Sequence, residues 1–482
     1  MSIRRNTAYN LIGSMVPIMV SLVTVPIYLR LIGEARYGVL AVAWMLLGYF
    51  GLFDLGLGRA TAQRIATLRN AAVCERAQAF WTALGLNIGL GVLGGLIIWP
   101  VADIFLGRIF KIDDAMRFEA LTVVPWLILA VPMATLSGVL TGALQGRERF
   151  FELNLISGVS SVLFQLIPLV VAKFWGVELG VLLPAAMFVR LLTVFVLYGY
   201  CRRYVFCGLP ASFVRTEASQ LLRFGSWVTV TSLISPMMII LDRFIIGALL
   251  GAKAVSYYTV PFQLADRTGI IPFALSSALF PRFVGMSREE EQIVAKKSLR
   301  AVLSVMTPMM ATGIVLMEPF LSWWITSAFG REAGLVGCIL LLGFWINALA
   351  MIPYAQLQAK GRPDIVAKCN LLELLPYFWM LYIGLNTLGL VGAAVAFSAR
   401  IFADFVLLSG FSGILRKSLR LLVLPMLLLI AAFLISTNIS FGSSEWFVLV
   451  IVHLSFTVAW AWRKVPAELR SLVLVRFGKI VR

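Results

Sequence analysis

The chain has 482 residues, of which 60% are hydrophobic and 13% are charged, and its mean hydropathy is +0.93. This composition excludes an ordinary soluble domain and indicates a polytopic membrane protein. The formal net charge of +18 would suggest a nucleic-acid ligand in a soluble protein. Here Lys and Arg stand in short loops between apolar stretches, as the positive-inside rule predicts, so we expect no nucleic-acid partner.

Apolar stretches long enough to cross a bilayer recur along the chain, since a membrane helix needs about 20 such residues. They begin near Ala8, Tyr37, Phe80, Glu119, Leu153 and Val177, then near Phe224, Ala254, Leu299, Ala333, Cys369 and Leu388, and finally near Leu421 and Trp446. We predict an all-α polytopic membrane protein with about fourteen transmembrane helices. The first stretch shows no signal-peptide cleavage site, so it is expected to be a retained helix.

The basic residues are unevenly divided between the two sides that these helices would create. Roughly 29 of the 41 Lys and Arg residues fall on the side that carries both termini. We therefore place both termini in the cytoplasm. The five cysteines include no CxxC pair and are expected to be free thiols.

The second half of the chain resembles the first when it is shifted by about 218 positions. Gly33 then aligns with Gly251, Gly51 with Gly269, Ala60 with Ala278 and Arg64 with Arg282, and with a small slip Leu144-Gln145-Gly146-Arg147 matches Leu357-Gln358 and Gly361-Arg362. Chance matching of small and apolar residues is the alternative, against which the polar matches count. Six spans per copy make two parallel lobes around a central cavity, as in many transporters. We predict lobes at 1–210 and 211–415, followed by two extra helices and a basic tail at 416–482.

Four arginines lie within the predicted spans: Arg190, Arg243, Arg267 and Arg400. An arginine at the centre of a membrane helix costs about 2.5 to 3.5 kcal/mol when it faces lipid. We therefore expect all four to face a water-filled cavity that binds an anionic substrate. Arg190 has no acidic residue within one helical turn and lies deep in its span, so it is the strongest candidate.

Acidic neighbours provide a competing, structural interpretation for the other arginines. Asp404 follows Arg400 by four residues on one helical face, so the two can pair. Asp242 and Asp266 each directly precede an arginine. Because neighbouring side chains diverge by about 100° on a helix, we expect neither of these pairs to neutralise itself.

Three carboxylates are candidates for H+ or Na+ coupling: Asp242, Asp404 and Asp54. Asp54, like Glu318 and Glu373, lies near a predicted span end, where interfacial solvation also explains a charge. We expect no metal site, because the single histidine has no cluster of ligands around it.

Several motifs resemble a known transporter family. They are Asn6-Thr7 with Asn10, Pro26-Ile-Tyr-Leu-Arg30, Gly33, Tyr37-Gly38, Leu52-Phe-Asp-Leu-Gly-Leu57, Leu144-Gln-Gly-Arg147 and Asp242-Arg243-Phe-Ile-Ile-Gly247. These positions resemble the polysaccharide-transport branch of the multidrug/oligosaccharidyl-lipid/polysaccharide (MOP) exporter superfamily, which includes the Wzx-type O-antigen and exopolysaccharide flippases. The similarity extends over most of the chain but consists of dispersed positions.

The resemblance implies a flippase of the bacterial inner membrane and not an enzyme. Its substrate would be an undecaprenyl-pyrophosphate-linked oligosaccharide, moved from the cytoplasmic to the outer leaflet by alternating access. Arg190, Arg267 and Arg400 would receive the pyrophosphate, and Arg243 would lie nearer the outer mouth. The implied partners are the lipid-linked glycan, the bilayer and a polysaccharide polymerase or export machinery. We expect no cofactor, with H+ or Na+ as the candidate coupling ions at the carboxylates named above.

Three other classes of protein fit parts of the sequence. A cation-coupled small-molecule exporter of the multidrug type shares the architecture, but it would carry cavity carboxylates rather than arginines. A lipid II flippase is poorly distinguished by sequence from the first interpretation. A glycan polymerase or ligase would need a catalytic loop outside the membrane, and no stretch between spans exceeds about 25 residues.

Overall fold

The computed structural model describes residues 3–68, 70–283 and 286–465, and every regular element in these ranges is a helix. Eleven helices among the described residues are long and apolar enough to span a membrane. The predicted all-α membrane fold is therefore confirmed, whereas the count of about fourteen spans is not.

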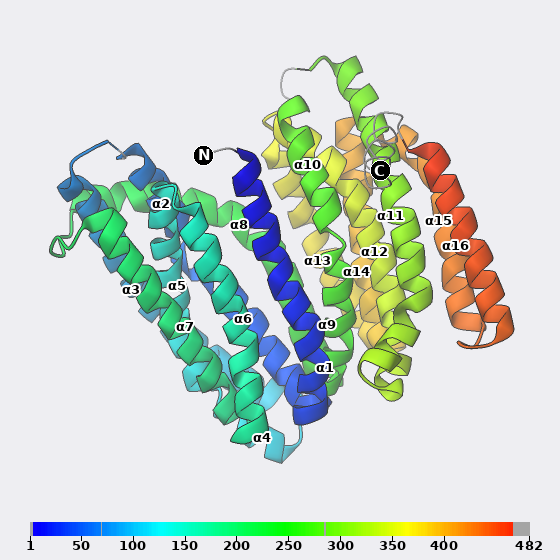
Figure 1. Cartoon of the computed structure of the whole chain (residues 1–482), viewed down its shortest axis with the longest axis horizontal. Coiled ribbons are helices and arrows are strands. Elements are labelled where there is room, and N and C mark those ends of the chain that lie inside the picture. Colours follow the sequence, from blue (N-terminus) through cyan, green and yellow to red (C-terminus); the bar gives the residue numbers. More distant parts are fainter. Residues whose placement is uncertain (1–2, 69, 284–285, 466–482) are drawn as a thin grey trace, which may run out of the picture. The chain divides into compact units, whose positions relative to one another are not determined.

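The chain divides into two compact units, Met1–Ser256 and Tyr257–Arg482. The first contains α1 (Ile3–Tyr49), η1 (Phe50–Asp54), α2 (Leu57–Thr67), α3 (Val73–Ile104), η2 (Phe105–Ile109), α4 (Asp114–Leu121), α5 (Val124–Gly146), α6 (Phe150–Phe174), α7 (Leu179–Cys201), η3 (Arg202–Phe206) and α8 (Arg215–Leu250). Helices α3, α5 and α7 run side by side in this unit (Figure 1). Their core includes Phe80 and Phe206, whose stacked rings lie 5.0 Å apart.

Helix α9 (Ala252–Arg267) crosses the division between the units. The second unit continues with α10 (Ile270–Phe283), α11 (Arg288–Trp324), α12 (Ser327–Ala359), α13 (Pro363–Leu388), α14 (Leu390–Ser412), α15 (Leu415–Asn438) and α16 (Ser444–Lys464). Helix α12 packs against both α11 and α14. Phe262 and Phe344 lie in this core, with ring centroids 5.2 Å apart, and the indole N–H of Trp345 donates to the hydroxyl of Thr307 at 3.1 Å.

The first compact unit extends beyond the lobe boundary predicted at residue 210. Helix α8 packs against α2 and α3. An ion pair reinforces this packing, with Nε of Arg64 on α2 2.8 Å from Oε2 of Glu217 on α8. The division therefore falls after Ser256. The predicted second lobe at 211–415 and the appended segment at 416–482 stay predictions.

Two glycines that the internal repeat matches share one backbone conformation. Gly33 has φ 80° and ψ 165° at a kink within α1, and Gly251 has φ 89° and ψ 175° at the end of α8. Residues other than glycine rarely adopt this region of φ and ψ. The same unusual conformation at matched positions supports the predicted repeat.

The second and eighth predicted spans are each interrupted near a matched glycine. Gly51 lies in η1 between α1 and α2, and Gly269 lies between α9 and α10. Each of these predicted spans therefore consists of shorter helical pieces. This is one reason why fewer continuous spans are found than the hydropathy pattern predicts.

The turns before α6 and α13 also correspond. The amide of Arg149 donates to the carbonyl of Leu144 at 3.0 Å, and the amide of Arg362 donates to the carbonyl of Leu357 at 2.9 Å. These equivalent hydrogen bonds align Arg149 with Arg362. The sequence alignment, which matched Arg147 with Arg362, was shifted by two residues at this turn.

Candidate functional site

Arg190 lies at the midpoint of α7, with eleven residues of Leu179–Cys201 on either side. Its guanidinium carbon lies 5.3 Å from the centroid of the Phe164 ring on α6. Within the part of the chain that the structure describes, no carboxylate pairs with this guanidinium. An aromatic face compensates only partly for the lost hydration of a cation. Among the described residues, the charge of Arg190 is therefore not neutralised by a carboxylate.

The contact between α6 and α7 carries further polar groups beside Arg190. The hydroxyl groups of Ser160 and Thr193 form a hydrogen bond of 2.6 Å. Ser160 precedes Phe164 by four residues and Thr193 follows Arg190 by three, so each pair lies on one face of its helix. Arg190 thus belongs to a group of polar side chains, with Ser160 and Thr193, at the contact between α6 and α7.

Helix α1 adds polar contacts on another side of α6. The Thr24 hydroxyl donates to the side-chain oxygen of Gln165 at 3.2 Å, and the Tyr28 hydroxyl donates to the backbone carbonyl of Gln165 at 2.6 Å. Trp44 packs edge-on against Tyr28, with ring centroids 5.2 Å apart, and lies 5.9 Å from Phe164. Sequence reasoning missed this group because uncharged side chains give no signal in an apolar span.

Arg243 and Asp242 of α8 are both buried and form an ion pair with each other. Nη1 of Arg243 lies 2.8 Å from Oδ1 of Asp242, and the two residues are 4% and 0% exposed. The expectation that these neighbours diverge too far to pair is therefore wrong. The long arginine side chain can bend around the helix, and a buried charge gains most from the nearest opposite charge.

Arg267 is the last residue of α9 and its side chain is exposed. The helix ends there because the amides of Thr268 and Gly269 turn back to the carbonyls of Ala265 and Asp266. The sequence placed Arg267 inside a continuous span, and this placement is wrong. A cation at a helix C-terminus is favoured by the helix dipole, which explains part of its stability.

Arg400 of α14 lies beside two carboxylates. Its Nη1 is 3.7 Å from Oε2 of Glu373 on α13. Asp404, one turn after Arg400, lies close enough to Glu373 for the two carboxyl groups to interact electrostatically. The Arg400 guanidinium also lies 5.4 Å from the centroid of the Tyr377 ring. The ion pair that the structure shows for Arg400 joins it to Glu373 on α13 rather than to Asp404 within α14, and the three residues form a cluster across these two helices.

Glu373 is the member of this cluster that sequence reasoning misplaced. The sequence put it near a span end, but it is 5% exposed and stands ten residues after Pro363, where α13 begins. The start of the span was placed too late because Asp364 and Lys368 make the first turns polar. Pro363 at the first helical position is the signal that could have located this start.

Asp54 caps the N-terminus of α2. Its Oδ1 accepts a hydrogen bond from the amide of Gly56 at 2.7 Å, and its Oδ2 accepts one from the amide of Gly58 at 3.2 Å. A carboxylate at a helix N-terminus is stabilised by these amides and by the helix dipole. The contacts give Asp54 a clear role in holding α2, and its role in ion coupling stays a prediction.

The fold and these sites define a class, that of multi-pass helical membrane proteins built from two compact units with charged residues inside their spans. The family model described as "Polysaccharide biosynthesis protein" matches residues 3–287, more than half of the chain. The chain belongs to this family.

Two curated relatives match most of the chain. A "Putative O-antigen transporter" of Shigella flexneri is 29% identical over 409 residues, which cover 85% of this chain and 97% of the relative. The "Lipopolysaccharide biosynthesis protein WzxC" of Escherichia coli is 22% identical over 411 residues, which cover 82% of this chain and 79% of the relative.

Solved structures of two transporters share the fold. Lipid II flippase MurJ in an inward closed conformation matches with a TM-score of 0.71 and 14% identity, over 99% of this chain and 100% of that one. An inward-facing multidrug resistance MATE family transporter of the MOP superfamily matches with a TM-score of 0.65 and 16% identity, over 84% and 99%. The resemblance to a polysaccharide-transport family is confirmed by the family model and the curated relatives, and the solved transporters, one of them of the MOP superfamily, share the fold. These matches are with transporters and not with enzymes.

Proposed function

We propose that this transporter flips polyprenyl-pyrophosphate-linked oligosaccharides from the cytoplasmic to the outer leaflet of the bacterial inner membrane, by alternating access. The product would serve the synthesis of O-antigen or another exported polysaccharide. The family and the names of its relatives support a polysaccharide precursor as the cargo. The observation that carries the proposal is the guanidinium of Arg190 at the middle of α7.

The surroundings of Arg190 favour a ligand that is rich in hydrogen-bond acceptors. A guanidinium presents five N–H groups, and its planar shape matches two phosphate oxygens at once. Near it, the buried indole N–H of Trp44 has no hydrogen-bond partner among the described residues. Both donors belong to residues that contact the Phe164 ring. A pyrophosphate joined to a sugar supplies both the anionic and the neutral acceptors that such a site requires.

The other three arginines differ in whether a neighbouring carboxylate or solvent already compensates the charge of the guanidinium. Arg267 is exposed, and Arg400 shares two carboxylates that need not both be ionised. We propose that these two also contact the pyrophosphate during transport. Arg243 is balanced by Asp242, so in this proposal it mainly stabilises α8 and contributes positive potential.

The first test is transport by the full chain reconstituted in liposomes with a polyprenyl-pyrophosphate-linked oligosaccharide, scored by exposure of the sugar on the far leaflet. Arg190→Ala should lower the rate roughly 10- to 100-fold, since a hydrogen bond to a charged group contributes about 1.5 to 3 kcal/mol. Arg190→Lys should give an intermediate rate, because an ammonium keeps the charge but loses the bidentate geometry. The matched control is Arg108→Ala, which removes an exposed arginine. Transport that survives Arg190→Ala unchanged would refute the role of this residue.

The same assay separates the proposed cargo from its alternatives. Lipid II and a lipophilic organic cation are offered as competing cargoes, since the fold is shared with a lipid II flippase and with a multidrug transporter. We expect the oligosaccharide lipid to be moved and the cation to be ignored. Transport of the cation alone would replace the proposal with a small-molecule exporter, and preference for lipid II would replace it with a peptidoglycan-precursor flippase.

We propose that the cluster of Glu373, Asp404 and Arg400 couples transport to H+ or Na+. Two carboxylates that share one guanidinium carry a surplus negative charge, which a proton or sodium ion can neutralise. An imposed ion gradient should accelerate transport by the wild type, and Asp404→Asn or Glu373→Gln should abolish this response. Asp114→Asn is the control, because the Asp114 side chain at the start of α4 is almost fully exposed. A response that persists in both cluster variants would rule out coupling here.

A further inference from the structure

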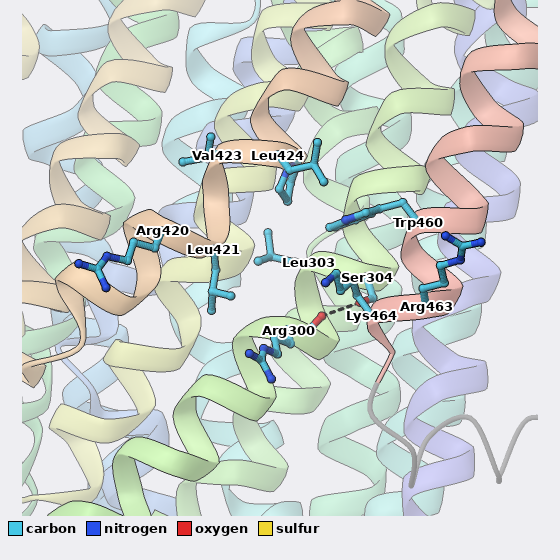
Figure 2. Close-up of a pocket in the computed structure, with 11 residues that line it drawn as sticks. Arg300, Leu303, Ser304, Arg420, Leu421, Val423, Leu424, Trp460, Arg463 and Lys464 are labelled. Carbon is cyan, nitrogen blue, oxygen red and sulfur yellow. Dashed lines mark hydrogen bonds between the residues drawn. The ribbon is translucent and has the colours of Figure 1, made fainter.

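A cavity in the second unit is lined by four cationic side chains. It has a volume of ≈ 500 Å³ and lies between α11, α15 and α16. Arg300 comes from α11, Arg420 from α15, and Arg463 and Lys464 from α16, so three helices each supply at least one cation around the same space (Figure 2). Neither the proposed pyrophosphate-binding residues nor the proposed coupling cluster lines this cavity.

No acidic residue lines the cavity, and the described parts of the chain supply no ion pair to any of its four cations. The four side chains therefore repel one another around a shared space. An anion placed in this space would be attracted by all four. Lys464 and Arg463 also end α16, where the helix dipole adds partial negative charge that favours cations and helps to hold them there.

Helix lengths place all these cations at one boundary of the membrane. At 1.5 Å per residue, Arg300 stands about 36 Å from the end of α11 at Trp324, and Arg420 about 27 Å from the end of α15. Arg463 stands about 28 Å from the start of α16. These lengths are close to the hydrocarbon thickness of about 30 Å, so each cation lies near the level of the lipid headgroups. Trp460, which also lines the cavity, is of the residue type that favours this level.

The helices next to the cavity offer an apolar path for acyl chains. On α15, Val423 lines the cavity and is 60% exposed, and Leu427 one turn further is 56% exposed. On α16, Phe456 and Val452 continue from Trp460 toward the other boundary and are 57% and 61% exposed. A free phosphate ion would gain nothing from these surfaces, whereas the chains of a phospholipid would contact them.

We propose that the cavity between α11, α15 and α16 binds the phosphate-bearing headgroup of an anionic membrane phospholipid. The headgroup is held by Arg300, Arg420, Arg463 and Lys464, and the acyl chains lie along α15 and α16. A basic pocket between membrane helices is a known type of headgroup site. The bound lipid would connect the C-terminal helix pair to α11, and this lipid is distinct from the transported one.

The test measures binding of phosphatidylglycerol to the purified full chain by titration and native mass spectrometry. Arg300→Gln combined with Arg420→Gln should weaken binding roughly 30-fold, since each cation near a headgroup contributes about 1 kcal/mol. The matched control combines Lys296→Gln with Arg416→Gln, which removes one exposed cation from each of the same helices outside the cavity. Arg463→Gln combined with Lys464→Gln repeats the test from α16 if the first pair fails to fold.

Loss of phosphatidylglycerol in both cavity variants and its retention in the control would support the site. Equal loss of phosphatidylglycerol in the control would show that binding depends only on the overall positive charge at this end of α11 and α15, which would overturn the proposal. Retention of the lipid in the cavity variants would also overturn it. Phosphatidylcholine that binds as tightly would overturn the anionic specificity. Inorganic phosphate that displaces the lipid at millimolar concentration would reassign the cavity to a free phosphate ion. These readouts are independent of transport, so they do not depend on the proposed flippase activity.

Discussion

The charged side chains inside the spans compensate for lost hydration in different ways. Arg243 is paired with its sequence neighbour, and Arg400 lies beside Glu373 on another helix. Arg190 instead lies over an aromatic ring. Since a buried cation without a counter-charge is costly, it is retained only where it has a use. This difference between the arginines is what makes Arg190 the central residue of the proposed substrate site.

The buried pair of Asp242 and Arg243 leads to a prediction on stability. Asp242→Asn should lower the free energy of unfolding by about 3 to 5 kcal/mol, because it breaks the ion pair that Arg243 makes with Asp242 in a buried environment. Removing both charges, with Arg243→Gln added, should restore part of this loss. The measurement is thermal unfolding of the purified protein in detergent.

The control for this prediction is an ion pair on the surface. Arg362 and Asp364 at the start of α13 lie 3.1 Å apart and are well exposed, so Asp364→Asn should unfold close to the wild type. If the two Asp variants lost the same stability, the buried pair would not have the proposed importance.

At the scale of the elements, the ends and breaks of helices determine which residues reach a site. Two continuous apolar stretches are divided by the breaks around Gly51 and Gly269. Conversely, α13 begins earlier than hydropathy indicates and so carries Glu373 into its interior. Capping groups at these ends supply the amide partners that a helix terminus lacks.

The start of α11 offers a prediction on local stability. Ser287 and Glu290 form a capping box, in which the Glu290 amide donates to the Ser287 hydroxyl oxygen at 3.3 Å and the Ser287 amide donates to Glu290 Oε2 at 3.1 Å. Ser287→Ala should therefore weaken the first turn by about 1 kcal/mol. Amide hydrogen exchange at residues 290 and 291 should become roughly fivefold faster. Exchange that does not change would show that the cap is not needed.

The effect of this capping box should depend on pH. Hydrogen bonds from the side chain and backbone of Ser287 lower the pKa of Glu290 in the folded chain. The stabilisation from its carboxylate is therefore present above the unfolded pKa of about 4.3 and is lost as pH falls through the folded value. The difference between wild type and Ser287→Ala should accordingly shrink in acid below about pH 4.

At the scale of the whole molecule, basic residues set the orientation that we propose, with both termini in the cytoplasm. The free cysteines allow a direct test. Cys74 at the start of α3 and Cys207 after η3 are exposed, and both lie on the predicted cytoplasmic side. The buried thiols of Cys201, Cys338 and Cys369 should react slowly.

Two chains that keep only Cys74 or only Cys207 should react with a membrane-impermeant maleimide after the cells are opened and not before. A single-cysteine chain with Ser443→Cys, between α15 and α16, serves as the control for the opposite side and should react in intact cells. Reaction of Cys74 or Cys207 in intact cells would reverse the proposed orientation.

The sequence by itself determined the class of this protein, its helical fold and its family, and it predicted an internal repeat. It could do so because a bilayer requires about 20 apolar residues in a row, and this requirement is visible locally in the chain. It also identified Arg190, since a central charge in such a stretch is evident without knowledge of neighbouring helices.

Only the tertiary structure decided which charged side chains from different helices come into contact. Glu373 joins Arg400 across two helices, and the cationic cavity collects Arg300, Arg420 and Arg463 from three. The hydropathy pattern does not predict these contacts, because they depend on where each helix begins, how it is rotated and which of its faces packs against a neighbouring helix. The pairing of Arg243 with Asp242 likewise depended on the path of a flexible side chain in a buried environment.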